Sequence, residues 1–528
     1  MKKIIKDYIR EIKDLLKSRK YLYTIIFIAI LSFGFAITHY AMGVDDLCFD
    51  RYVKGTYILS AKRWGTWALY NILNITEFSP FWLDFLTATG IIIIAILVSA
   101  FIKKETKEKN IMTYIIFSGI FISSPLINNF FLYQSTNFAI VVSNIIVIIC
   151  GILIYYNYFE VKKKRIYPIV GLILTISLSM YESCAQTFIV FLLMTLYIRI
   201  NKENLKAKEM IKYVFLGIAS LAIGVIAYAI TGKILLQILE HYNLKQTDYA
   251  GNGIYWYNEL INTLPLSTKI EVFKIAISKE FGRCYNNIIV TIFALATAIT
   301  MIIEIIQGIK NKQISKILIV LGIILTNFIL IFAQAKIMFR TQFSWILTIT
   351  FEIYIIYKTL NNIKYTKHIV NIVVILMILM QSRQLSQLFY NDYKRYEKDK
   401  VIANEIAIDL VKETNYKEKY IVYYTYNNER DTIFSTGQDN GTSIISWGVE
   451  AFDELATETT DFINSLGYEF LYPTGEMDLE ELKAVYESLD DETKEKNVIE
   501  LEDYIIVNLD KYELLVEEWV KLSISYWN

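Results

Sequence analysis

The sequence predicts an all-α polytopic membrane protein with about eleven transmembrane helices, followed by a small α/β domain. Three observations predict this class. The 528-residue chain is 54% hydrophobic with a mean hydropathy of +0.37, which is more apolar than a soluble protein of this size. Long apolar runs with few charges recur up to Leu385. From Leu385 onward the chain carries 13 Lys and Arg against 32 Asp and Glu, whereas the preceding part carries 40 against 21.

The first segment, residues 1–20, places Ile, Leu and Tyr at helical spacing between Lys and Arg. This pattern predicts an amphipathic helix on the cytoplasmic membrane surface, and a frayed basic tail is the alternative. Residues 21–385 form the expected membrane domain. Its predicted spans are 21–38, 81–102, 111–131, 138–159, 166–181, 184–198, 213–231, 286–308, 317–334, 342–358 and 369–385.

The orientation follows from the short connectors. Lys and Arg gather in every second connector and in the N-terminal segment, and cytoplasmic loops collect these residues. The N-terminus is therefore expected in the cytoplasm of a bacterial cell and the C-terminal domain outside its plasma membrane. Residues 166–198 have basic flanks on both sides, so they are expected to cross twice, with a turn at Tyr181–Glu182–Ser183.

Two further segments differ from the predicted spans in length and composition. Residues 54–73 are too short and too polar to span, and Tyr57, Trp64 and their neighbours at helical spacing predict a helix on the outer surface. Residues 386–528 form the acidic domain, which is expected to lie outside the cell. In it, 420–426 and 503–509 have the composition of strands, and 458–467 and 478–489 that of helices.

The adjacent carboxylates Asp45 and Asp46 follow the first span and are expected at the level of the outer lipid headgroups. A carboxylate there suits a general base that accepts a proton from an acceptor hydroxyl. Two together also suit a divalent cation such as Mg²⁺ or Mn²⁺, so metal dependence stays open. A solvated pair that merely follows a helix end is the plainer alternative.

Several short motifs resemble those of the Gtr type II membrane glucosyltransferases, which are related to the class C glycosyltransferase fold. The Asp45–Asp46 pair is followed by an aromatic residue and then by Arg63-Trp64-Gly65, and Tyr181-Glu182-Ser183 matches a later outer turn. Residues 390–407 resemble the family's stretch after its last span. Family members often carry Gln where this chain has Glu182.

The resemblance implies that the protein transfers a hexose, with glucose as the first candidate, from a polyprenyl-phosphate donor to a surface glycan on the outer face. Such a reaction leaves a lipid phosphate, so cations are expected near the leaving oxygen. The outer candidates are Arg63, Arg283, Lys336 and Arg340, with snorkelling at helix ends as the alternative. Glu182, with Tyr181, is the candidate for orienting the acceptor or a metal.

Aromatic residues crowd the expected outer loop 232–285, where Tyr255 and Trp256 are candidates for stacking on a sugar ring. An interfacial aromatic belt explains the same residues. The expected partners are the lipid bilayer, the donor and the glycan acceptor, and a flippase that delivers the donor is a further candidate. No nucleic-acid partner is expected.

Two other functions fit a many-span protein with outer loops. One is a flippase or exporter of lipid-linked sugars, and the other is a glycan polymerase. A carrier is expected to place ionisable residues in mid-span. The sequence suggests that Glu304 and Glu352 lie towards the cytoplasmic ends of their spans, and this favours surface chemistry by a transferase.

Overall fold

The computed structural model divides the chain into two compact units. Unit 1 comprises Met1–Thr38 and Phe49–Leu388, and unit 2 comprises His39–Cys48 and Phe389–Asn528. The structure describes residues 2–47, 49, 56–75, 77–203, 205–244, 270, 288–310, 313–329, 341–361, 363, 366–424, 444–445, 457–471 and 479–512.

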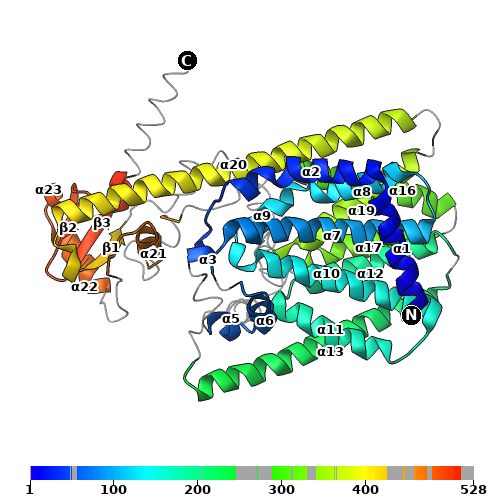
Figure 1. The fold of residues 1–528 in the computed structure, drawn as a ribbon, viewed down its shortest axis with the longest axis horizontal. Helices are drawn as coiled ribbons and strands as arrows, with labels where there is room; N and C mark the ends of the chain where they lie inside the picture. The colour runs from blue at the N-terminus through cyan, green and yellow to red at the C-terminus, as the bar shows by residue number, and fades with distance from the viewer. Residues whose placement is uncertain are drawn as a thin grey trace. The chain divides into compact units, whose positions relative to one another are not determined.

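Unit 1 is a bundle of α-helices (Figure 1). A helix lies over each segment that the sequence predicts as a span. Seven helices in the described part of the chain are long and apolar enough to cross a membrane: α2, α7, α10, α13, α19, α20 and the run Ile111–Phe131 that includes α8 and α9. The helices of this unit are α1 (Lys2–Lys17), α2 (Arg19–Thr38), α5 (Tyr57–Ser60), α6 (Trp64–Ile72), α7 (Pro80–Thr106), α8 (Ile111–Ile122), α9 (Asn128–Phe131), α10 (Gln134–Tyr156), α11 (Ile166–Met180), α12 (Cys184–Ile200), α13 (Ala207–His241), α16 (Ile288–Lys310), α17 (Ile314–Thr326), α19 (Phe343–Asn361) and the first part of α20 (Lys367–Glu413).

The expected turn at Tyr181–Ser183 is present, because α11 ends at Met180 and α12 begins at Cys184. The packing partners give the direction of each arm. On α11, Gly171 meets Ser220 and Ile223 of α13, and Glu182 further along meets Tyr228, so α11 and α13 run parallel. On α12, Leu192 meets Gly217, and the later Thr195 meets the earlier Tyr213, so α12 runs antiparallel to α13. The two arms therefore form a hairpin.

In two segments the structure differs in detail from the sequence prediction. The helix expected over 54–73 is broken into α5 and α6, because Lys62 between them adopts a left-handed conformation with φ of 61°. Residues 123–137, which cover the end of the predicted span 111–131 and the connector to the next span, fold into the 3-10 turn η1 (Pro125–Ile127), α9 and the start of α10. Their polar side chains are buried, so this irregular backbone lies within the protein.

Unit 2 contains a three-stranded sheet in the order β1-β3-β2. The expected strands are confirmed as β1 (Tyr420–Tyr424) and β3 (Tyr504–Asn508), which pair in parallel, and β2 (Val498–Glu500) pairs antiparallel to β3. The expected helices are confirmed as α21 (Thr457–Ser465) and α22 (Leu479–Ser488). The remaining elements are α3 (Val44–Leu47), the 3-10 turn η4 (Tyr416–Glu418), α23 (Asp491–Lys494) and the end of α20.

The segment His39–Cys48 belongs to unit 2 because its apolar side chains pack there. Met42 and Leu47 lie against a core formed by α20, the sheet and α21. The rings of His39 and Tyr393 lie 5.3 Å apart, and those of Tyr40 and Tyr396 lie 5.4 Å apart. The loop that carries the Asp45–Asp46 pair thus packs against the core of the acidic unit, which the sequence did not predict.

Candidate functional site

Arg63 and Glu182, which are 119 positions apart in the chain, come together in unit 1. The guanidinium Nε of Arg63 lies 4.0 Å from Oε2 of Glu182, and its Cζ lies 5.0 Å from the centre of the Tyr181 ring. At 4.0 Å the two charges attract each other without a hydrogen bond. The structure therefore joins two of the motifs that the sequence singled out, Arg63-Trp64-Gly65 and Tyr181-Glu182-Ser183.

Close packing of α6 on α11 holds the first motif in place. A Cβ atom on Gly65 would lie 2.3 Å from Ser179 Oγ and 3.0 Å from the carbonyl oxygen of Ile176, so only glycine fits here. The next residue, Thr66, donates a hydrogen bond of 3.0 Å from Oγ1 to the carbonyl oxygen of Met180, directly before the turn. These contacts explain why a glycine follows Arg63-Trp64.

Tyr228 of α13 completes the cluster from a third helix. Its hydroxyl donates a hydrogen bond of 2.6 Å to Oε1 of Glu182. The relative solvent exposure is 25% for the Arg63 side chain and 30% for the Glu182 side chain, so the cluster is open to a ligand. A guanidinium, a carboxylate held by a phenol and an aromatic face together suit a phosphorylated sugar. The sequence missed Tyr228, because one tyrosine inside an apolar run carries no signal.

Asp84, in the first turns of α7, is a second carboxylate at this end of the bundle. Unlike Glu182 it is buried, and the sequence analysis also missed it. Its two oxygens accept hydrogen bonds of 2.8 Å from Gln134 Nε2 and 3.2 Å from Asn137 Nδ2. Asp84 therefore fastens the start of α10 to α7. A signal was present in the sequence, since an ionisable residue within an apolar run is a candidate by default.

Eight polar side chains of the 123–137 segment are buried, and two of them, Gln134 and Asn137, bind Asp84. Amide and hydroxyl groups placed in this way are the donors and acceptors that small polar ligands use. They are Ser123, Ser124, Asn128, Asn129, Gln134, Ser135, Thr136 and Asn137.

Asp45 and Asp46 lie in unit 2, in the short helix α3. Asp46 is buried, and its carboxylate accepts a hydrogen bond of 3.0 Å from the backbone N–H of Gly43. This bond closes the turn that carries the pair. Asp45 is half-buried.

The comparison with protein families shows to which family the chain belongs. The model of a family described as "Glucosyl transferase GtrII" matches residues 31–380, about two-thirds of the chain. The chain belongs to this family. Membership in the GtrII family indicates that the chain is a glucosyltransferase, and the apolar helices indicate a membrane protein. No curated protein matches the chain, and no solved structure matches it.

The match to the GtrII family covers Asp45, Asp46, Arg63, Asp84, Glu182 and Tyr228 but ends before most of unit 2. Five candidate residues of the sequence analysis lie outside the described residues: Tyr255, Trp256, Arg283, Lys336 and Arg340. Within the described part of the chain, no group of three or more His, Cys, Asp or Glu side chains is placed to hold a metal ion. The divalent cation therefore stays a prediction.

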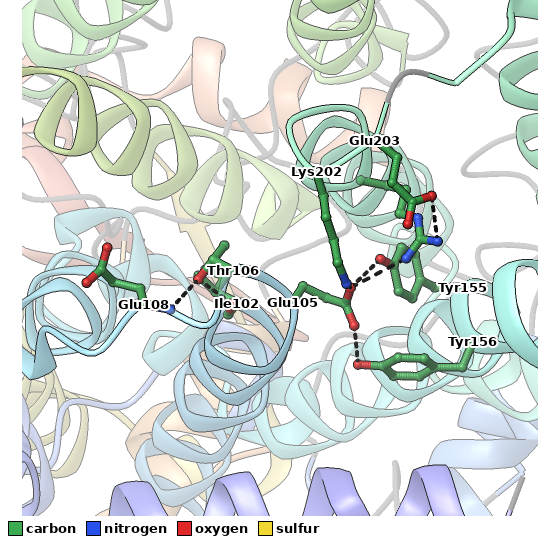
Figure 2. Close-up of polar contacts among 9 residues, drawn as sticks. Ile102, Glu105, Thr106, Glu108, Tyr155, Tyr156, Lys202 and Glu203 are labelled. Carbon is green, nitrogen blue, oxygen red and sulfur yellow. Dashed lines mark hydrogen bonds and ion pairs between the residues drawn. The ribbon is translucent and has the colours of Figure 1, made fainter.

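A separate polar cluster lies at the opposite end of the GtrII bundle, around Glu105 near the end of α7 (Figure 2). The buried carboxylate of Glu105 accepts hydrogen bonds of 2.6 Å from Tyr155 and 2.9 Å from Tyr156. Lys202 Nζ lies 3.3 Å and Arg199 3.9 Å from it. Glu105 is 21 residues beyond Asp84 on α7, which is about 30 Å along a helix. This cluster ties α7, α10 and α12 together, away from the candidate site.

Proposed function

We propose that this GtrII protein transfers a glucosyl residue from a polyprenyl-phosphate donor to a cell-surface glycan, on the outer face of the bacterial plasma membrane. The observation that carries the proposal is the cluster of Arg63, Tyr181, Glu182 and Tyr228. It presents a cation and a carboxylate, both partly exposed, at the helix ends opposite the basic connectors around Glu105. A lipid-linked donor would present its phosphate and sugar at the membrane surface, beside helix ends of this kind.

In the proposed reaction an acceptor hydroxyl oxygen attacks the anomeric carbon of the donor. The bond between that carbon and the phosphate oxygen breaks, and its electron pair stays on the lipid phosphate. Arg63 stabilises the charge that develops on the phosphate, since guanidinium groups bind phosphate oxygens strongly. The proton of the acceptor hydroxyl goes to a carboxylate base. Asp45 stays the candidate that the sequence predicts for this role, and it is proposed separately from the cluster in unit 1.

Glu182 is the proposed positioning group for the sugar. Its Oε1 is held by Tyr228, and its Oε2 faces Arg63. A carboxylate fixed in this way accepts hydrogen bonds from sugar hydroxyls in a set direction, which contributes to orientation in the reacting complex. The amides and hydroxyls of the 123–137 segment, with Asp84, are candidates for further sugar contacts.

The proposal is tested with membranes that contain the full-length protein and a radiolabelled polyprenyl-phosphate glucose. We expect label to move to a glycan acceptor, and Asp45→Asn to abolish the transfer while the protein remains folded and inserted. If Asp45→Asn keeps full activity, Asp45 is not the base. A protein that only moves intact labelled lipid between leaflets is a carrier, and one that extends the glycan by preassembled oligosaccharide units is a polymerase.

The proposed orientation has its own test. Cys48 lies two residues after Asp46 in the sequence, and a membrane-impermeant thiol reagent added to intact cells should label it. Labelling only after the cells are opened would place that loop in the cytoplasm and remove the outer-face reaction.

A further inference from the structure

Unit 1 contains a line of buried polar side chains between four helices that pack on one another, α12, α16, α17 and α19. On α19, Ser344, Thr348 and Glu352 are spaced by four residues and share one face. On α16, Thr297, Thr300 and Glu304 share a face in the same way. All except Thr297 are buried, with exposures of 1% or less. We name these six residues the polar column.

Hydrogen bonds hold the side chains of the column in three separate groups. Near one end, Asn327 Nδ2 donates to Thr348 Oγ1 at 2.8 Å, and Ser344 Oγ donates to Asn327 Oδ1 at 2.8 Å. At the centre, Thr297 Oγ1 lies 3.1 Å and 3.0 Å from the two carboxyl oxygens of Glu352. Near the other end, Tyr197 of α12 donates to Glu304. From Ser344 to Glu352 the column rises about 12 Å along α19.

Glu352 is the tenth residue of the 19-residue helix α19, so it lies mid-helix. This position corrects the expectation that Glu352 lies towards a helix end. Within the described residues its carboxyl group contacts the Thr297 hydroxyl and has no ion pair. A carboxylate buried without a cation is strongly disfavoured, and such groups take up a proton instead.

Among the residues that the structure describes, the groups around Glu352 do not supply the missing positive charge. The titratable residues on the helices packed against α19 are Glu304 and Lys310 on α16, Cys184, Tyr197 and Arg199 on α12, and Tyr114 on α8. Arg199 pairs with Glu105 and Glu203, and Tyr197 binds Glu304. Lys316 of α17 interacts with Glu304, which gives that carboxylate the cation that Glu352 lacks. On α19 itself, Tyr354 and Tyr357 are neutral phenols, and Lys358 lies six residues further along the helix.

We propose that Glu352 is a proton-binding site inside the membrane domain, where the Thr297 hydroxyl contacts its carboxyl group. The ligand is a proton, which Glu352 carries in the resting protein. This site is separate from the proposed glycosyl transfer, and it has the placement that proton-coupled membrane proteins use for protonatable side chains.

The test is labelling with a hydrophobic carbodiimide, which adds to a protonated carboxyl group in an apolar site. The acid proton moves to a carbodiimide nitrogen, the carboxyl oxygen bonds to the central carbon, and rearrangement gives a stable N-acylurea. The full-length protein in lipid vesicles is labelled at about pH 6 and about pH 9, and the adducts are located by mass spectrometry. We expect an adduct at Glu352 that falls about tenfold or more at the higher pH.

Controls separate a neutral acid from general reactivity. Glu105, whose carboxylate faces Lys202 and Arg199, should stay unlabelled in the same sample. Thr297→Val removes the hydroxyl that favours the ionised form, so labelling should persist to higher pH, whereas Thr297→Ser should behave as the parent. Absence of an adduct at Glu352 at both pH values, equal labelling at both, or labelling of Glu105 to the same extent overturns the proposal. These three overturning outcomes are measured on the parent protein, so they do not depend on the folding of any variant.

Discussion

Tyr228 donates a hydrogen bond of 2.6 Å to Glu182 and thereby sets the direction of a carboxylate that also faces Arg63. The two residues come from α13 and from the turn between α11 and α12. This bond connects the parallel packing of α11 and α13 to the chemistry of the site, because a shift of either helix would misplace Glu182.

The Tyr228→Phe variant tests this connection. Loss of a hydrogen bond to a charged group costs about 1.5–3 kcal/mol, so we expect a fall of roughly 10- to 100-fold in kcat/KM for the lipid-linked donor. The measurement is initial-rate kinetics in reconstituted vesicles. Tyr242→Phe is the matched control, since Tyr242 is an exposed tyrosine next to the end of α13 and should leave the rate unchanged. Equal effects of both changes would contradict a specific role for Tyr228.

Gly65→Ala tests whether the fit of α6 on α11 positions Arg63. The new methyl group would meet Ser179 and the Ile176 carbonyl, and overpacking of this kind costs about 1–3 kcal/mol. We expect a lower melting temperature together with reduced transfer. In Gly34→Ala the methyl group would meet only Ile30 at 3.8 Å, an ordinary contact, so that variant should melt like the parent. An unchanged Gly65→Ala protein would show that α6 tolerates displacement.

Glu105→Gln separates stability from catalysis. The change leaves Arg199 and Lys202 without their shared carboxylate, and we expect a loss of about 1–3 kcal/mol in the free energy of unfolding. Donor KM should stay the same, because the cluster lies far from Glu182. Glu203→Gln removes only a partly exposed pair with Arg199 and should change stability by less than about 1 kcal/mol. A change in donor KM in Glu105→Gln would argue for coupling between the two ends.

A pH effect is expected in unit 2. Glu500 accepts hydrogen bonds from Lys419 Nζ and from the backbone N–H of Asn415, and these bonds lower the pKa of its carboxyl group below the usual 4.5. A lowered pKa in the folded state adds stability above pH 4.5, which is lost as the pH falls through the folded value. The protection of the Asn415 amide against hydrogen exchange, taken relative to its intrinsic rate at each pH, should therefore fall as the pH drops below 4.5 in the parent. In Glu500→Gln this protection should be low at every pH, and protection equal to the parent's would contradict this contact.

The helices were predictable because long apolar runs have few alternatives in a membrane protein. The hairpin at Tyr181–Ser183 followed from the charge of its flanks, and the strands β1 and β3 followed from their composition. The break at Lys62 was not predictable, because it depends on a left-handed residue other than glycine. The continuous helix α20 was also missed, since the change from apolar to charged residues near Leu385 suggested a boundary.

The site was only partly predictable. Short motifs pointed to Arg63, Tyr181 and Glu182, and the structure brings these three together. Tyr228 and Asp84 came from single residues within apolar runs, and their partners are more than 40 positions away. The grouping of the Asp45–Asp46 loop with unit 2 depends on tertiary packing of Met42 and Leu47, which no local pattern shows.

Donor dependence in Glu182→Gln and Arg63→Gln tests the account most directly. Both proteins and the parent are reconstituted with radiolabelled polyprenyl-phosphate glucose, and transfer of label is measured against donor concentration. We predict that Arg63→Gln raises the donor KM and lowers kcat, because the phosphate loses its cation, and that Glu182→Gln lowers kcat/KM by roughly 10-fold or more. Parent-like kinetics in both variants would contradict the claim that the Arg63–Glu182 cluster is the site of glucosyl transfer.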